Sequence, residues 1–319
     1  MTAIASHTVC DLPFMGFLPL CAPSGTRPTS IAGRVDFPHL MSIQHRALDE
    51  FVGQSLTGSE LALDIKHAQL TVQDLVVMVK ESNLTIKGPL SDTLAGFVLD
   101  AKDTSRGLQR LSSKILGAID SITSFNTYVM HEIDTTTQKG TRTQLDETLV
   151  RMFRASMDNF SSQISRLLVS ASIAANSLDR LEERLSTAHA LCIQETIATT
   201  FAQDDLLWRL WSILGGNKDQ RRDLENRSSV LKEVTQYRAV AMAYVFAAMQ
   251  ALTAVDADLT ALRERLVASD VSTQDLPLEV HIASIQRGLY RVHDTKIGSR
   301  DEQPRLVGEV RRSQVGGSE

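Results

Sequence analysis

Apolar residues recur at alternating spacings of three and four along much of the chain, a repeat that places their side chains on one face of an α-helix. Two long stretches keep this pattern without a break. The first comprises Leu94, Phe97, Ala101, Thr104, Leu108, Leu111, Ile115, Ala118, Ile122, Phe125 and Val129. The second comprises Val150, Phe153, Met157, Phe160, Ile164, Leu167, Ala171, Ala174, Leu178, Leu181, Leu185, Ala188 and Cys192. Each stretch predicts one long helix, and Thr104 is the only polar member of the first stripe.

A third stripe predicts a long helix nearer the beginning of the chain. It comprises Leu61, Ile65, Ala68, Val72, Leu75 and Val79. This helix should begin near Pro38 and end at Asn83, but Gly53 and Gly58 lie inside it. Because a glycine costs about 1 kcal/mol relative to alanine in a helix interior, we expect the helix to be broken or kinked there.

A fourth stripe lies in the second half of the chain. It comprises Leu224, Leu231, Val234, Ala241, Val245, Ala248, Leu252, Val255, Leu259, Leu262 and Leu266. Arg227 and Arg238 interrupt it, so they either pair with carboxylates or lie at a solvated end. Residues 239–255 of this helix carry no charge. A membrane span needs about 20 mainly apolar residues, and this run is shorter and contains Gln250. We therefore predict a buried bundle helix, with a membrane span as the alternative.

Turn signals separate the long helices. The second helix should begin at Pro89, which suits a first turn, or at Ser91, which suits an N-cap. A threonine-rich turn is expected from Asp134 to Thr143, before the third helix begins. These connections are short enough to join antiparallel neighbours.

Shorter helices are expected between and after the long ones. Residues 197–214 form an aromatic-rich segment that ends at Gly215-Gly216, where a helix C-cap explains both glycines better than a phosphate-binding loop. Pro277 should open a last helix. Its apolar face comprises Leu278, Ile282, Ile285, Leu289 and Val292.

The stripes predict an all-α fold, an elongated antiparallel bundle of three to four long heptad-patterned helices with shorter capping helices. The sequence has no repeat of fixed period that would indicate a solenoid. Residues 38–299 should form a single helical-bundle domain. Residues 1–37, which are rich in Pro, Gly, Ser and Thr, should be irregular or disordered, and residues 300–319 should be a disordered tail.

Charge and cysteine content narrow the setting. The net charge is −5 at pH 7 and no clustered basic face is evident, so nucleic acid is not an expected partner. Cys10, Cys21 and Cys192 are widely spaced and odd in number, which favours reduced thiols in a cytoplasmic protein over a disulfide framework or a zinc site. No Lys or Arg precedes the first apolar stretch, so we do not expect a signal peptide.

The apolar patch at residues 12–20 is an exception in the irregular N-terminal segment. It either docks onto the helical body or anchors the chain at a membrane interface. The expected localisation is therefore cytoplasmic, with attachment to the periphery of a membrane as the alternative.

No residues indicate catalytic, cofactor-binding or metal sites. The chain has 8 histidines, and none pairs with another at the spacing that places two ligands on one helix face. His45 with Asp49 and His131 with Glu132 are interpreted as solvated surface pairs. Cys192 lies three residues after His189, but its position on the apolar stripe favours a core thiol over a nucleophile.

Two segments carry a resemblance to known proteins. They are SELALDIKHAQLTVQDL near the N-terminus and LGGNKDQRRDLENRSSVLKEVTQYRAVAMAYVFAAMQAL, continued by LTALRERL, from Leu214 onward. Residues 40–295 are similar to a family of fungal all-helical proteins with no known activity. The resemblance implies an all-helical fold and brings no catalytic residue, ligand or pathway.

Three classes of function remain open. The first is a non-enzymatic interaction or scaffold protein, with a protein partner or self-association. The second is a membrane-associated helical bundle that uses residues 12–20 or 239–255, although balanced charge on the long helices argues against a sensor of membrane curvature. The third is an enzyme with a site between helices, and no small-molecule substrate is evident for it.

Overall fold

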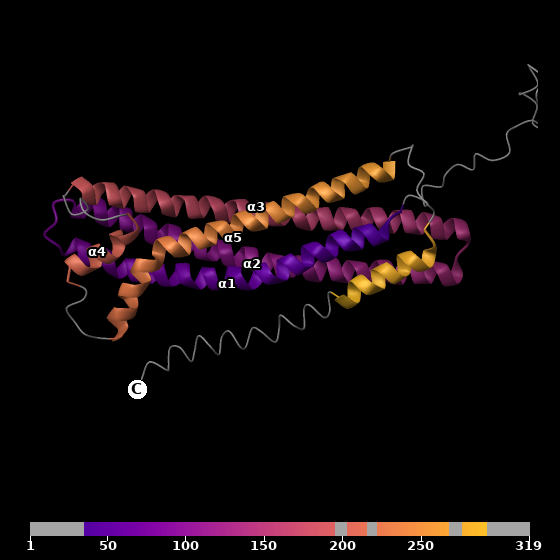
Figure 1. The fold of residues 1–319 in the computed structure, drawn as a ribbon, viewed down its shortest axis with the longest axis horizontal. Coiled ribbons are helices and arrows are strands. Elements are labelled where there is room, and N and C mark those ends of the chain that lie inside the picture. Colours follow the sequence, from indigo (N-terminus) through magenta and orange to yellow (C-terminus); the bar gives the residue numbers. More distant parts are fainter. Residues whose placement is uncertain (1–34, 195–202, 216–221, 268–275, 292–319) are drawn as a thin grey trace, which may run out of the picture.

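The computed structural model describes residues 35–194, 203–215, 222–267 and 276–291, and gives the backbone alone for residues 52–56, 203 and 222–228. Most of these residues form long helices (Figure 1), which are α1 (Phe37–Lys80), α2 (Lys87–Lys139), α3 (Arg142–Gln194) and α5 (Arg222–Val267). The short α4 (Leu206–Ile213) follows a 3-10 turn at Gln203–Asp205, and a last helix spans 278–291. No β-strand occurs in the described ranges, and the predicted all-α bundle is confirmed.

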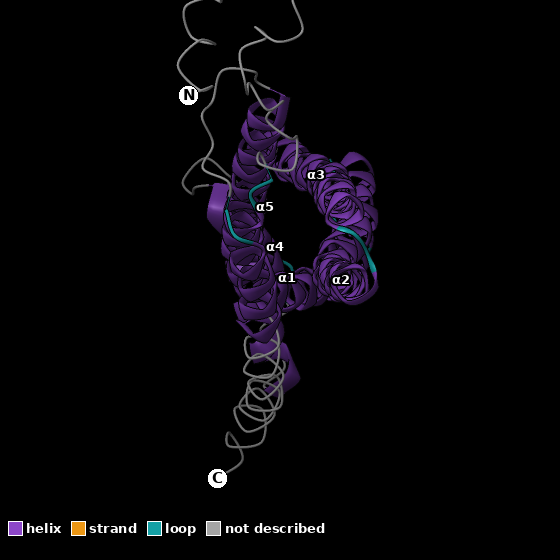
Figure 2. Cartoon of the chain, turned by 90° about the vertical axis from the view of Figure 1, so that its right-hand side faces the viewer, coloured by secondary structure: helices purple, strands orange, loops and turns teal. Residues whose placement is uncertain are grey.

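The long helices surround a common core in the order α1, α2, α3, α5, and each packs against the two beside it (Figure 2). Neighbours run in opposite directions. On α1, Ser59 hydrogen-bonds Ser112 of α2 at 2.9 Å, while the earlier Gln44 accepts a 2.7 Å bond from the later Asn126. α2 and α3 have 53 residues each, which corresponds to roughly 80 Å at 1.5 Å per residue. The molecule is therefore an elongated up-down-up-down bundle.

The predicted stripes form the core of the bundle. Among the stripe residues with described side chains, Phe125, Val150 and the interrupting Arg238 are half-buried and the others are buried. Phe153 and Phe160 of α3 have no exposed surface. Fully burying such a side chain contributes about 1.5–3 kcal/mol. Burial of the stripes against one another is thus the main source of stability.

The structure corrects the expected break in the first helix. α1 is continuous from Phe37 to Lys80, so neither Gly53 nor Gly58 ends it. Tyr244 of α5 packs directly against Gly58, so the glycine allows the two helices to approach closely where a larger residue would not. The cost of the glycine in helix propensity is offset by this packing.

The turn expected between Asp134 and Thr143 lies within that range, at Gly140 and Thr141, but it is much shorter than predicted. α2 continues to Lys139 and α3 begins at Arg142. The hydroxyls of Thr136 and Thr137 donate to carbonyls one turn earlier in α2, at 2.9 and 2.8 Å, so these threonines stay helical. Because these hydroxyls find backbone acceptors within α2, the threonines do not end the helix.

The bounds of other elements differ slightly from expectation. α2 begins at Lys87, before both Pro89 and Ser91. The short helix expected at 197–214 is described from residue 203, and Gly215 has the positive φ of 88° that a helix-ending glycine adopts. Predictions for residues 1–34, which include the 12–20 patch, and for the tail at 300–319 lie outside the described residues.

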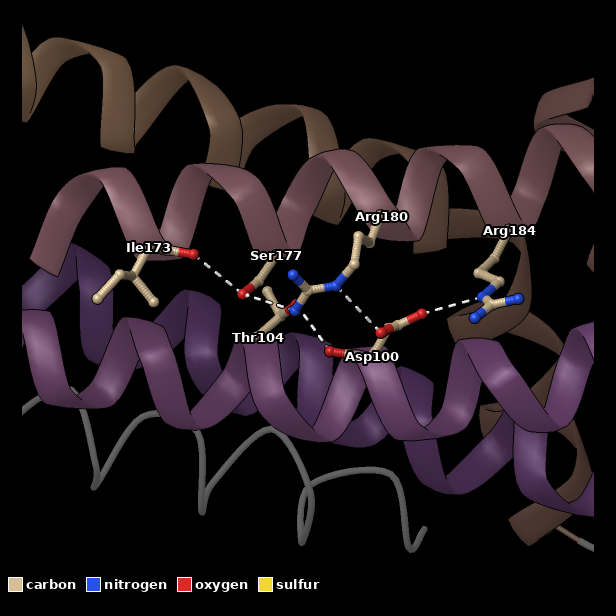
Figure 3. A network of polar contacts seen from close by, with 6 residues as sticks. All are labelled: Asp100, Thr104, Ile173, Ser177, Arg180 and Arg184. Carbon is tan, nitrogen blue, oxygen red and sulfur yellow. Dashed lines mark hydrogen bonds and ion pairs between the residues drawn. The ribbon is translucent and has the colours of Figure 1, made fainter.

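A polar network at Asp100 fixes α2 against α3 (Figure 3). Its carboxylate accepts hydrogen bonds from Arg180 Nε at 3.3 Å and Arg184 Nε at 3.0 Å. Gly96 lies one turn before Asp100, and a β-carbon there would come within 2.9 Å of Arg184 Cζ. Thr104, the polar stripe residue, is buried and donates to the Asp100 carbonyl at 2.8 Å. These contacts form in only one register of α2 against α3, because any other register would separate Asp100 from the two arginines.

Candidate interaction surface

Residues on the inner and lateral faces of α5 contact both neighbouring helices, α1 and α3. Arg46 of α1 lies 2.9 Å from Asp258 Oδ2, while Arg238 of α5 lies 2.7 Å from Glu182 Oε2 of α3. Of the two outcomes predicted for Arg238, pairing with a carboxylate is therefore the one observed. Arg227 lies among the residues whose side chains are not described. These contacts leave the face of α5 that points away from the bundle exposed.

That exposed face carries a second series of uncharged residues, also spaced by three and four. We call it the outer α5 stripe. It comprises Gln236, Val240, Ala243, Ala247, Gln250, Ala254, Ala257 and Ala261, all of them exposed. Lys232 precedes the stripe and Glu264 follows it, and both are exposed. α5 therefore has two heptad series, one buried in the bundle and one facing outward.

The outer face of a bundle helix normally carries charge at each turn. On α2, for example, Asp103, Arg106, Arg110 and Asp120 are exposed. The outer α5 stripe lacks such residues, and Phe246 beside it is 54% exposed. An uncharged exposed face of this length is typical of a surface that another molecule covers.

Leu63 of α1 is another exposed apolar residue at about this level of the bundle. Leu63 is 60% exposed and Val240 is 45% exposed. Leu63 follows Ser59 by one turn, and Ser59 hydrogen-bonds Ser112 of α2, so Leu63 lies on the α2 side of α1 and not beside the outer α5 stripe.

The polar residues at the beginning of the outer α5 stripe are engaged with one another. Tyr237 donates its hydroxyl to the Glu233 carboxylate, and burial together with this carboxylate raises the pKa of Tyr237. Across the interface on α1, burial raises the pKa of Asp64, and the charges of Glu60 and Glu233 add to the effect. Glu233 is thus already bound within its own chain.

By length and composition alone, α5 also qualifies as a helix able to cross a membrane, over Ser229–Val267. Only 33% of its most apolar 18-residue window is buried. The core helix of a soluble protein passes the same criterion. The inner residues of the segment 239–255 are packed against α1 and α3, so the segment belongs to the bundle as predicted, but the prediction that it is buried holds for this inner face only.

The residues considered for chemistry are spread over the bundle. Cys192 is fully buried on the α3 stripe, as expected of a core thiol. His45 Nε2 lies 3.3 Å from Asp49 Oδ2, and the ring is half-buried while Asp49 is exposed, so His45 is less solvated than predicted; His131 of the second predicted surface pair is exposed. Over the part of the chain that the structure describes, no group of three or more His, Cys, Asp or Glu residues could hold a metal ion.

Comparison with models of protein families gave no match, and a search of curated proteins found no relative. The resemblance to fungal helical proteins therefore stays a prediction.

Proposed function

We propose that this chain is a non-enzymatic interaction protein, and that the outer α5 stripe pairs with the same stripe of a second copy. The observation that carries the proposal is the second heptad series on α5, exposed and uncharged from Gln236 to Ala261. Heptad spacing is what a helix needs to keep one face against another helix, and small residues allow the two backbones to approach closely.

The charges at the two ends of the stripe favour an antiparallel pair. The stripe is centred between Ala247 and Gln250, so a twofold axis there brings Lys232 of one chain level with Glu264 of the other, within one residue. A parallel pair would place like charges side by side. Arg265 is also exposed and level with Lys232 in this arrangement, on the flank of the stripe toward α1, so it offsets part of the attraction between Lys232 and Glu264. Exposed ion pairs contribute only about 0.2–1 kcal/mol each, so they select the orientation more than they tighten the dimer.

The size of the stripe predicts a weak dimer. From Gln236 to Ala261 it is roughly 40 Å long, and a helix is about 10 Å wide, which gives on the order of 400 Å² for each chain. Stable interfaces cover about 800 Å² on each partner. We therefore expect association in the micromolar range or weaker, with Phe246 adding contact at one edge.

Sedimentation equilibrium of the full chain over a concentration series tests the proposal. Ala247→Glu should abolish association, because it places like charges at the centre of the interface, while Ser165→Glu at an exposed position of α3 should leave association unchanged. Lys232→Glu and Glu264→Lys should each weaken association, and the double variant should restore it. A wild-type chain that remains monomeric throughout, or an Ala247→Glu variant that still dimerises, contradicts the proposal.

Membrane association is a second candidate, because α5 meets the length and composition criterion for a membrane span. A flotation experiment with phosphatidylcholine vesicles discriminates the two. Flotation of the wild type and loss of flotation in Ala247→Glu would favour lipid as the molecule that covers the outer α5 stripe. Wild-type protein that stays at the bottom of the gradient removes the support for this candidate.

A further inference from the structure

The last helix, 278–291, lies at the end of the bundle where α1 begins and α2 ends (Figure 1). His281 stacks edge-on against Phe37 of α1, with ring centres 5.9 Å apart. Gly288 faces Met41 of α1, and a β-carbon on it would lie 3.2 Å from Met41 Sδ. The last helix therefore runs parallel to the first turns of α1, and its other flank faces α2.

An apolar cleft lies between the last helix and α2. Its volume is about 390 Å³, and its lining residues are Thr123, Thr127, Gln286, Leu289 and Tyr290. The hydroxyls of Thr123 and Thr127 donate to the carbonyls of Ile119 and Thr123, at 2.8 and 3.0 Å. Because both hydroxyls are already hydrogen-bonded within α2, the threonines contribute mainly methyl surface to the cleft, beside Leu289 and the ring of Tyr290.

The cleft is open to solvent and uncharged. Tyr290 is 74% exposed, and Leu116, one heptad before Thr123 on the same face of α2, is 45% exposed. None of the lining residues is charged, in a chain in which charged residues make up 22%. A cleft with such walls gains more from an apolar side chain than from a polar or ionic ligand.

Three segments outside the described residues begin at the end of the bundle that holds the cleft. They are 1–34 before α1, 268–275 after α5, and 292–319 after the last helix. The second and third of these segments carry charges and contain no aromatic residue. The first contains the apolar patch at residues 12–20, which has no charge and includes Phe14 and Phe17. The composition of this patch therefore matches the walls of the cleft.

The linker that follows the apolar patch is long enough to reach the cleft. Asn126 of α2 donates to Gln44 of α1 at 2.7 Å, so the cleft lies at about the level of Gln44, roughly 14 Å along α1 from Val35. The chain from Leu20 to Val35 spans up to about 50 Å when it is extended, at about 3.3 Å per residue. The patch can therefore fold back onto its own bundle.

We propose that the cleft between α2 and the last helix binds the apolar patch at residues 12–20 of the same chain. A phenylalanine ring of the patch lies between the threonine methyls and Leu289 and covers the exposed ring of Tyr290. The linker holds the patch near the cleft at an effective concentration on the order of millimolar. A contact too small to hold a separate partner is therefore sufficient, and it fastens the last helix to α2.

Photo-cross-linking of the full chain tests the proposal. A chain with p-benzoylphenylalanine in place of Phe17 should form a cross-link within the same chain to residues of the cleft, which mass spectrometry locates. A concentration well below the micromolar range keeps the proposed dimer dissociated, so the two proposals are tested separately. Thr123→Asp should lower the yield at least tenfold, because it places a charge in the apolar wall. Ser165→Asp, exposed on α3, should leave the yield unchanged.

Hydrogen exchange provides a second measurement that leaves the cleft unaltered. The double variant with Phe14→Asp and Phe17→Asp should speed amide exchange in the last helix by about tenfold or more, because the helix loses a contact that holds it against α2. Thr29→Asp lies between the patch and α1, and it should leave this exchange rate unchanged.

The same experiments identify other occupants of the cleft. A cross-link between two chains would assign the cleft to a second copy. Flotation with phosphatidylcholine vesicles that the double variant abolishes, without a cross-link to the cleft, would assign the patch to lipid. Either result overturns the proposal, as does a cross-link confined to other helices or an exchange rate that the double variant leaves unchanged.

Discussion

The hydroxyl of Tyr244 occupies the space beside Gly58 where a β-carbon would stand, 2.5 Å from the position of that carbon. The contact joins the middle of α5 to α1 and gives a mid-helix glycine a structural role. Because the aromatic ring of Tyr244 is rigid and buried in a packed interior, a methyl group at residue 58 forces the helices apart.

Gly58→Ala should therefore destabilise the protein by about 1–3 kcal/mol, the usual cost of overpacking. Gly117 of α2 is the matched control, since nothing lies within 4 Å of a β-carbon built there. Gly117→Ala should stabilise the protein by about 0.5–1 kcal/mol through helix propensity. Urea unfolding measures both changes, and two variants with the same sign of effect would show that the Tyr244 contact does not restrict residue 58.

Asp100→Asn should cost about 1 kcal/mol. The substitution weakens two contacts with Arg180 and Arg184, which are about half exposed, and exposed ion pairs contribute about 0.2–1 kcal/mol each. The nearby Asp103 is exposed, so Asp103→Asn should change the free energy of unfolding by less than about 0.5 kcal/mol. The difference in free energy of unfolding between the two variants should shrink at 1 M salt. Equal losses of stability in Asp100→Asn and Asp103→Asn would show that the Asp100 network adds nothing to stability.

Phe160→Ala should destabilise the protein by about 3–5 kcal/mol, because it leaves a cavity on the fully buried α3 stripe. Ile173 lies on the same helix but is 57% exposed, and Ile173→Ala should have an effect of less than about 1 kcal/mol. Thermal unfolding of the two variants compares them directly. Similar losses at both positions would contradict the assignment of inner and outer faces on α3.

His281 should make the protein less stable in acid. Burial lowers the pKa of its imidazole below the ordinary value of 6.5, although the Asp36 carboxylate partly opposes the shift. As the pH falls through 6.5, the unfolded chain binds a proton at this residue and the folded chain does not, so the free energy of unfolding decreases. The contribution of neutral His281 to the free energy of unfolding is fully present above pH 6.5. It is lost as the pH falls toward the lower pKa of the folded state, at up to about 1.4 kcal/mol per pH unit.

Urea unfolding at pH 7.5 and pH 5.5 measures this dependence. His281→Leu should reduce the loss of stability between the two pH values, whereas the exposed His131→Leu should retain it. If His281→Leu loses as much stability between the two pH values as the wild type does, His281 is not the source of that loss.

The long stripes allowed the fold to be predicted, because a heptad repeat contains the information about which side of each helix is buried. Contacts between distant segments could not be predicted in the same way. The role of Gly58 depends on Tyr244, and the half-burial of His45 depends on the helix 278–291, both far away in the sequence. The helical threonines after Asp134 were misread, because composition alone does not reveal their bonds to the preceding turn.

The outer α5 stripe could have been predicted from the sequence, but it was not recognised there. The segment 239–255 was read as a single uncharged run, and the run merges two heptad series that lie on opposite faces. Separating Ala243, Ala247 and Ala254 from the buried Val245 and Leu252 needs only the helical period. That period does not identify a partner, and the end charges at Lys232 and Glu264 bear only on the orientation of the proposed pair.

The distance between spin labels on Ala261→Cys tests the antiparallel pairing most directly. The labelled chain would carry Cys10→Ser, Cys21→Ser and Cys192→Ala, and Ala261 is exposed near one end of the outer α5 stripe. A twofold axis between Ala247 and Gln250 places the two labels roughly 40 Å apart, at 1.5 Å per residue. A measured distance near 40 Å that disappears in Ala247→Glu is the predicted result, and a short distance of about 10 Å, or no coupling at concentrations well above the micromolar range, would contradict it.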